Sequence, residues 1–241
     1  MKENRRYWII AAMIGVAFLL IAAFTTANWY RSKSKAADPN AMTNSVNNSL
    51  TIPSNKNLDN VSAEDAVNRY LTREQELSTN LSKELKRMEA SGNGSLDYVK
   101  AMVSLNEATT LLSESYKTFG GNDETFKLLS QQTEKKLQTE NETMKELMDK
   151  YAREEHKNED MENAYLTDFD ALVAEFEKAG TMDSSSLEHA FSQALIQYDQ
   201  LAVNLSTSIL EYTDYNEIIT MAQKTINDRK PQIEELKKLT Q

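Results

Sequence analysis

The feature that most constrains this chain is an uncharged apolar run at residues 9–28, IIAAMIGVAFLLIAAFTTAN. A helix of twenty residues is about 30 Å long, which matches the hydrocarbon core of a bilayer. An aromatic pair stands on each side of the run, Tyr7-Trp8 before it and Trp29-Tyr30 after it, as is typical of membrane interfaces. A cleaved signal peptide has an apolar stretch of only about 7–15 residues. The run therefore predicts a retained transmembrane signal-anchor.

The basic residues beside the anchor do not fix its orientation, because each flank carries three of them: Lys2, Arg5 and Arg6 before it, and Arg31, Lys33 and Lys35 after it. A long domain can be translocated largely regardless of its charge, and the segment after the anchor resembles a spacer across an envelope. We therefore expect a single-pass protein of the cell membrane, with its amino terminus inside and its carboxy-terminal domain outside the cytoplasm.

The sequence divides into four parts. A basic amino-terminal flank occupies residues 1–8, and the anchor follows at 9–28. Residues 29–60 are rich in Asn, Ser and Thr and show no apolar period, so we expect a flexible linker there. Residues 61–241 are long enough for one domain with a core of its own. We expect this last part to be a helical bundle.

Composition narrows the partners of that domain. The chain beyond residue 35 holds 21 basic and 36 acidic residues, a net charge of −15. Nucleic acid and anionic lipid are polyanions, so this charge argues against both as partners. The chain has no cysteine, which excludes disulfides and thiolate ligands.

Apolar residues recur at spacings of three and four through the domain, which is the period of amphipathic helices. The first helix is predicted over 62–91, with Ser62 as its N-cap and Gly92 as its stop. The second is predicted from a cap at Ser95 to Phe119.

Two longer helices are predicted after these. No Gly or Pro interrupts residues 122–179, but the apolar stripe lapses near His156, where we expect a bend, a break or a locally unpaired segment. The fourth helix is predicted from about Asp183, and its stripe passes through Tyr212 without a gap. Pro231 ends this helix or starts a last short one, because proline is tolerated only in the first helical turn.

Short turns between successive helices predict antiparallel neighbours. The expected fold is all-α: an antiparallel up-and-down bundle of about four helices, behind a single N-terminal transmembrane helix and a flexible linker. The fourth helix has a mean apolar spacing close to the 3.5 of a coiled-coil seam. We expect the third and fourth helices to extend as a long, coiled-coil-like two-helix arm.

The residues that most often carry chemistry form no recognisable site. His156 and His189 are the only histidines, and neither lies in a Glu-x-x-His spacing, since Arg153 and Ser186 precede them by three. No EF-hand loop, phosphate-binding loop or nucleophile motif occurs. We therefore expect no enzyme activity, no cofactor and no metal site.

Five tyrosines of the third and fourth helices lie at spacings that place them on facing sides. They can pack the core, or they can line an interaction face, since tyrosine joins an apolar ring to a polar hydroxyl. The candidate interaction face consists of Tyr151, Tyr165, Tyr198, Tyr212 and Tyr215.

Three functions remain open on the sequence. The first is a membrane-anchored, extracytoplasmic bundle that serves as a structural or interaction module for another envelope or surface protein, or for a second copy of itself. The second is a sensory or ligand-binding bundle outside the cytoplasm. The third is a cytoplasm-facing, membrane-tethered coiled-coil scaffold, and this rests on architecture alone.

Overall fold

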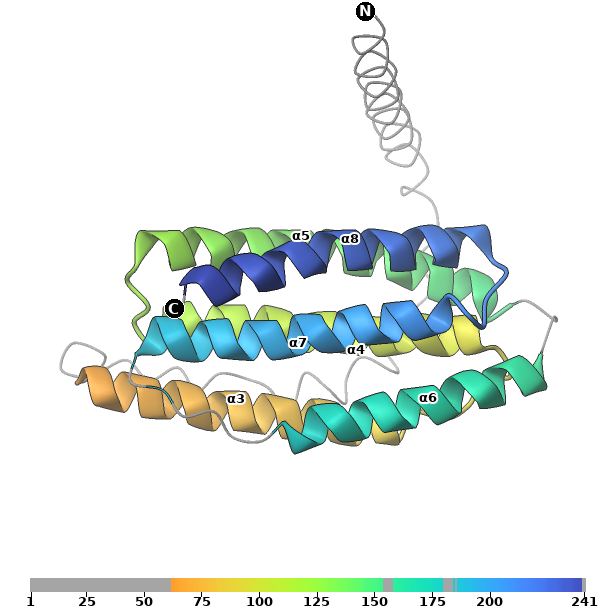
Figure 1. The fold of residues 1–241 in the computed structure, drawn as a ribbon, viewed down its shortest axis with the longest axis horizontal. Helices are drawn as coiled ribbons and strands as arrows, with labels where there is room; N and C mark the ends of the chain where they lie inside the picture. The colour runs from red at the N-terminus through yellow and green to blue at the C-terminus, as the bar shows by residue number, and fades with distance from the viewer. Residues whose placement is uncertain (1–61, 154–157, 180–183, 185, 240–241) are drawn as a thin grey trace, which may run out of the picture. The chain divides into compact units, whose positions relative to one another are not determined.

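The structure is a computed structural model that describes residues 62–153, 158–179, 184 and 186–239. All of these residues belong to the compact unit Ile52–Gln241. They form six helices and no strand (Figure 1): α3 (Ala63–Lys86), α4 (Gly94–Thr118), α5 (Glu124–Tyr151), α6 (Glu159–Lys178), α7 (Leu187–Ile209) and α8 (Asn216–Leu239). The prediction of an all-α bundle is confirmed.

The predicted basic flank 1–8, anchor 9–28 and linker 29–60 lie outside the described residues. Within the described ranges, no helix has the length and apolar character needed to cross a bilayer.

The six helices pack in three layers of two (Figure 1). The hairpins α4–α5 and α7–α8 hold the closest contacts, and α4 packs against α7 to join them. On the other side of α4 and α7, α3 and α6 lie along the outer face and meet each other. The four helices α4, α5, α7 and α8 thus form a bundle that α3 and α6 cover on one side.

Capping residues set the starts of the helices. Ser62 accepts a hydrogen bond from the backbone N–H of Asp65, which confirms the predicted N-cap of α3. The second helix is capped by Asn93 rather than Ser95, because the Asn93 side chain accepts from the N–H groups of Ser95 and Leu96. Charge also follows the helix dipoles, with acidic residues in the first turn of every described helix.

The break expected near His156 has its counterpart in the structure. The helix that starts after Gly121 ends at Tyr151, and α6 starts at Glu159 with Asn158 as its cap. Residues 154–157, which include His156, lie outside the described residues.

The prediction of one continuous fourth helix is wrong. The chain leaves the helix after Ile209 and re-enters it at Asn216. Thr213 holds the turn, because its hydroxyl lies 2.7 Å from that of Ser95 and accepts from the N–H of Tyr215 at 3.2 Å. Such side-chain contacts compete with helix formation. The predicted long arm is accordingly replaced, in the described residues, by helices that fold back on the bundle.

Pro231 neither ends nor starts a helix, which corrects the second expectation for this region. α8 runs through it to Leu239. The residues on either side explain the continuity: Arg229, Ile233 and Leu236 are buried on one face of α8, so tertiary packing outweighs the helix-breaking tendency of proline.

Candidate functional site

A set of buried polar side chains crosses the middle of the bundle. The Arg229 guanidinium of α8 donates to Asp199 of α7 at 2.7 Å, to Glu140 of α5 at 3.4 Å and to Asn106 of α4 at 3.5 Å. Asn106 in turn donates to the side-chain oxygen of Asn141 on α5 at 3.0 Å. We call these five residues the central polar layer. It links all four helices of the bundle.

The charges of this layer offset one another. Burial raises the pKa of Asp199 to about 6, although the guanidinium of Arg229 opposes the shift, so the carboxyl is ionised at neutral pH. The Glu140 carboxylate also forms an ion pair with Lys224, whose Nζ lies 3.0 Å from Oε1 of Glu140. Together with Lys224 the positive and negative charges balance, although Asp199 Oδ2 and Arg229 Nε have no hydrogen-bond partner among the described residues. Such a network suits a role in fixing the mutual register of the helices.

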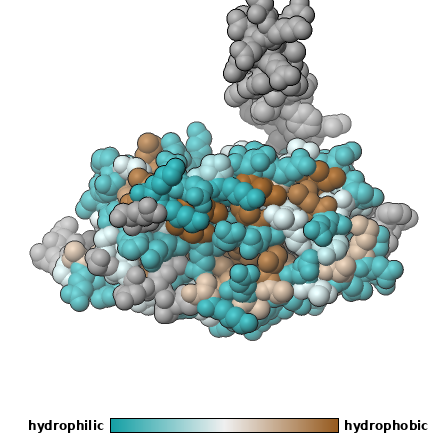
Figure 2. All heavy atoms as spheres, viewed as in Figure 1, coloured by the Kyte–Doolittle hydropathy of each residue, from teal (hydrophilic) through white to brown (hydrophobic). Residues whose placement is uncertain are grey.

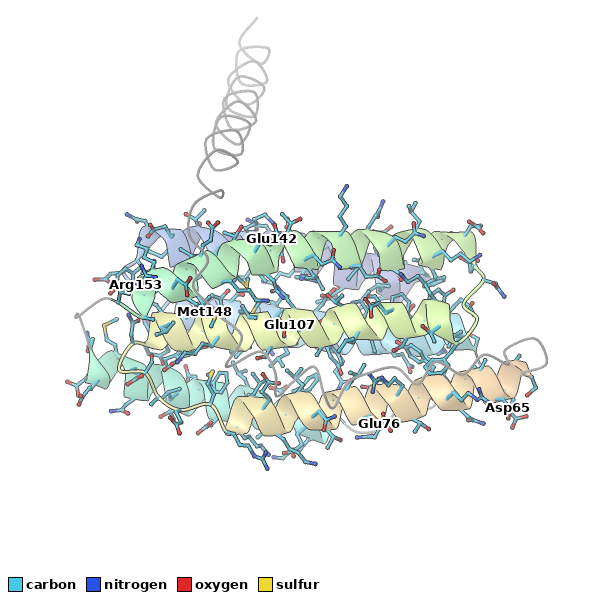
Figure 3. The ribbon with its side chains drawn as sticks, turned by 180° about the vertical axis from the view of Figure 1, so that it is seen from behind. Asp65, Glu76, Glu107, Glu142, Met148 and Arg153 are labelled. Atoms are coloured by element: carbon cyan, nitrogen blue, oxygen red, sulfur yellow. The ribbon has the colours of Figure 1, made fainter. Side chains whose placement is uncertain are left out.

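Ion pairs continue from the central polar layer along the contact between α5 and α8. Lys136 of α5 lies 3.1 Å from Asp228, and Lys150 lies 2.6 Å from Glu217. These two helices meet chiefly through long charged side chains, whereas α4–α5 and α7–α8 pack closely. The outer faces are also charged: Glu142 on α5 and Glu76 on α3 point outward in Figure 3.

At one end of the α5–α8 contact lies a groove between the start of α5 and the end of α8. We call it the leucine groove. Its lining residues are Thr125, Leu128, Leu129, Gln132, Gln232, Glu235, Leu236 and Leu239. Leu128 is 55% exposed and Leu239 is 44% exposed, and they are the exposed large hydrophobic side chains of the described residues. Elsewhere the visible surface is mainly hydrophilic, with apolar side chains in separate patches (Figure 2).

The five tyrosines of the predicted interaction face differ in their exposure. Tyr151, Tyr165 and Tyr198 are buried in the core. Tyr151 packs on the half-buried Tyr215 at 4.7 Å between ring centroids, and Tyr165 lies 6.2 Å from the half-buried Tyr212. Tyr151, Tyr165 and Tyr198 lie on three helices, whereas Tyr212 and Tyr215 lie in the turn between α7 and α8. These ring contacts support the core-packing alternative, and a partner-binding role for the five residues stays a prediction.

The histidine and the acidic side chains that the structure describes are spread over the fold. His189 is half-buried, and its Nε2 lies 3.0 Å from the side-chain nitrogen of Gln193. In the described part of the chain, no group of three or more His, Cys, Asp or Glu side chains is placed to hold a metal ion.

A pair of carboxyl groups at the start of α4 escaped the sequence analysis. Glu162 of α6 accepts from the backbone N–H of Gly92 and shares a hydrogen bond with Asp97 of α4. Both side chains are buried, and burial followed by the bond to Asp97 raises the pKa of Glu162. The pair fastens α6 to the turn between α3 and α4 when it holds one proton.

The central polar layer was also missed, although one signal for it exists. The residues of α8 that face the core are Ile218, Ala222, Thr225, Arg229, Ile233 and Leu236. Arg229 stands in this helical stripe where an apolar residue is expected, and a charge at such a position indicates a buried partner.

The fold and its polar layer define a helical-bundle domain. Residues 96–240 match the domain family described as Domain of unknown function (DUF305), which spans more than half of the chain. The chain therefore belongs to the DUF305 family. The match covers most of α4 and all of α5 to α7, and it reaches past the end of α8, but it leaves α3 outside. No curated protein and no solved structure gives a significant match.

Proposed function

We propose that this protein is a membrane-anchored helical bundle that serves as a structural or interaction module for another protein of the cell envelope. The apolar run 9–28 with its aromatic flanks supports the anchor. The leucine groove is the observation that carries the interaction, because it gathers the exposed leucines Leu128 and Leu239 at one place on a charged domain.

The chemistry of the groove specifies its occupant. Leu129 and Leu236 contribute apolar lining, and Gln132, Gln232 and Glu235 supply polar groups beside them. A groove between two antiparallel helices with this composition fits an amphipathic helix that places an apolar side chain in the groove and polar side chains over its edges. We propose that the leucine groove binds such a helix of a membrane protein of the same envelope.

If both proteins are anchored in one membrane, a small contact surface is sufficient for binding. Two proteins held in one membrane meet at a raised effective concentration, so a groove of few residues can hold a partner that it would bind weakly in solution. Interaction, rather than catalysis, is accordingly the activity that we propose.

The test is site-specific photo-cross-linking of the full-length chain in native membranes. A photoreactive residue replaces Leu128, and the matched control carries it at Gln138, which is also exposed on α5. The proposal expects a discrete adduct with a membrane protein from position 128 that is absent from position 138. Identical products from both positions, or none from either, would contradict it. An adduct of twice the chain's own mass would show that the groove binds a second copy of this chain instead of the proposed partner.

A further inference from the structure

The helix α3 stands apart from the rest of the bundle. It lies before the residues that match the family, and α4, α5, α7 and α8 surround the central polar layer without it. It packs on α4, α6 and α7 through the buried side chains of Val67, Leu77, Leu81 and Leu85. α3 is thus a cover on a bundle whose polar centre is formed by other helices.

The interface beneath α3 buries an ionisable group that is poorly paired. Glu74 is 2% exposed, and its Oε1 atom has no hydrogen-bond partner among the described residues. The hydroxyls of Tyr70 on α3 and Tyr198 on α7 are buried in the same way and likewise have no partner within that part of the chain. A carboxylate left there loses its hydration and receives little in return.

The electrostatics agree with this geometry. Burial raises the pKa of Glu74 from its ordinary 4.5 to about 7, and a hydrogen bond from Ser78 offsets only part of the shift. Burial, followed by the Glu74 charge, raises the pKa values of both Tyr70 and Tyr198. The charge of Glu74 therefore disfavours ionisation of both phenols.

Other charged and titratable groups reach this interface from each neighbouring helix. Arg73 of α3 acts on Tyr198, and Tyr116 of α4 acts on Tyr70. Glu188 of α7 accepts from the hydroxyl of Tyr116 at 3.2 Å. At the far end of α3, Lys86 forms an ion pair with Glu177 of α6.

We propose that α3 is a pH-sensitive latch, which docks on the bundle while Glu74 is protonated and detaches as Glu74 ionises. The sign follows from linkage: a carboxyl with a raised pKa in the docked state favours docking fully below its ordinary pKa of 4.5. That contribution is lost as the pH rises through about 7. The docking equilibrium then falls by up to about 300-fold, since each pKa unit is a factor of ten.

Detachment of α3 would also change how far the bundle can lie from the predicted membrane anchor. α3 has 24 residues, so its helix is about 36 Å long, and it connects the bundle to the segment that carries the predicted anchor. This consequence rests on the proposed membrane function, whereas the latch itself does not. Its failure and the failure of cross-linking at Leu128 are therefore separate results.

The test is hydrogen exchange of α3 in the full-length chain in lipid nanodiscs, corrected for intrinsic rates, at pH 5.5 and pH 8. Protection of α3 is expected to fall by about 30-fold at the higher pH, because pH 5.5 and pH 8 span only part of the titration. E74Q keeps the buried shape without the charge and should stay protected at both values. E64Q, an exposed position on the same helix, is the matched control and should follow the parent chain.

Equal protection of α3 at both pH values in the parent chain would overturn the latch, and so would the same loss in E74Q. A second measurement leaves Glu74 unchanged. Because the chain has no cysteine, spin labels can be placed at K86C and E177C alone, at two positions that adjoin in the docked state. Their distance distribution should broaden at pH 8, and an unchanged short distance would contradict detachment.

Discussion

The guanidinium of Arg229 on α8 and the carboxylate of Asp199 on α7 form a hydrogen-bonded ion pair at 2.7 Å, with 2% and 1% of the two side chains exposed. Taking both charges out of water is expensive, and their attraction repays this only while both partners are present. Because Arg229 also reaches α4 and α5, the pair connects the two helical hairpins.

Removal of one partner of this ion pair should therefore lower the free energy of unfolding strongly. R229M leaves Asp199 buried without its cation, and we expect a loss of about 3–5 kcal/mol in the free energy of unfolding. The double variant D199N/R229M should be less destabilised than R229M, because no unpaired charge remains at Asp199. Urea unfolding followed by circular dichroism gives both values.

The control for this prediction is K145M, which breaks the exposed ion pair of Lys145 with Glu107. An exposed pair contributes less than about 1 kcal/mol. If R229M costs no more than K145M, the central polar layer does not hold the bundle together.

Gly121 should tolerate no side chain while Tyr116 keeps its place. A Cβ atom at Gly121 would lie 2.3–2.5 Å from three ring atoms of Tyr116. The ring is held by stacking on Phe191 at 4.8 Å and by the hydrogen bond from its hydroxyl to Glu188. We expect G121A to cost about 1–3 kcal/mol.

A double-mutant cycle separates this clash from backbone effects. In a Y116A background the added cost of G121A should largely disappear, whereas purely additive costs would refute the contact. G120A is a useful comparison, because Gly120 has φ +96° and open space around its Cβ position, so its cost should not depend on Tyr116.

The Glu162–Asp97 pair should make stability depend on pH. The pKa of Glu162 is raised in the folded protein, so its contribution is present at low pH and is lost as the pH rises through that raised pKa. E162Q imitates the protonated acid and should flatten this part of the curve of unfolding free energy against pH. D160N, an exposed change in the same turn, should leave the curve of the parent chain unaltered.

Pro231 should be a site where the chain can be stabilised. It lacks the N–H that an interior helical residue donates, and its side chain is exposed. We expect P231A to raise the free energy of unfolding by about 1–3 kcal/mol. K230A at the exposed neighbouring position should change it little, and an equal response of the two variants would contradict the argument.

Local signals in the sequence predicted the helices well. Ser62 caps α3, as its position before an acidic turn indicates, and the lapse of the apolar stripe near His156 coincides with the end of α5 and the start of α6. Both features depend on residues a few positions apart in the chain, which a reading of the sequence can compare directly.

Contacts between distant residues decided what the sequence analysis got wrong. The turn between α7 and α8 depends on Thr213 meeting Ser95, which lies 118 residues earlier. The apolar stripe passes through this turn and gives no sign of it. In the same way, the spacing of Tyr151, Tyr165 and Tyr198 did not distinguish a core from an exposed face, because burial depends on which helices pack over them.

The candidate sites were harder to predict than the fold. Arg229 could be recognised as an anomaly in the stripe of α8, but its partners Asp199 and Asn106 lie on other helices. Leu128 looks like an ordinary helical leucine, and its exposure follows from the space between α5 and α8. Pairing of helices, which the sequence left open, determines both sites.

The most direct test of the proposed membrane-anchored, extracytoplasmic module is the topology of the full-length chain. Two fusions after Gln241 carry a reporter that is active only outside the cytoplasm and a reporter that is active only inside it. We predict activity of the outside reporter alone, in the membrane fraction, and loss of membrane association when residues 9–28 are deleted. Activity of the inside reporter alone would contradict the account. So would recovery of the uncleaved, full-length protein outside the membrane fraction.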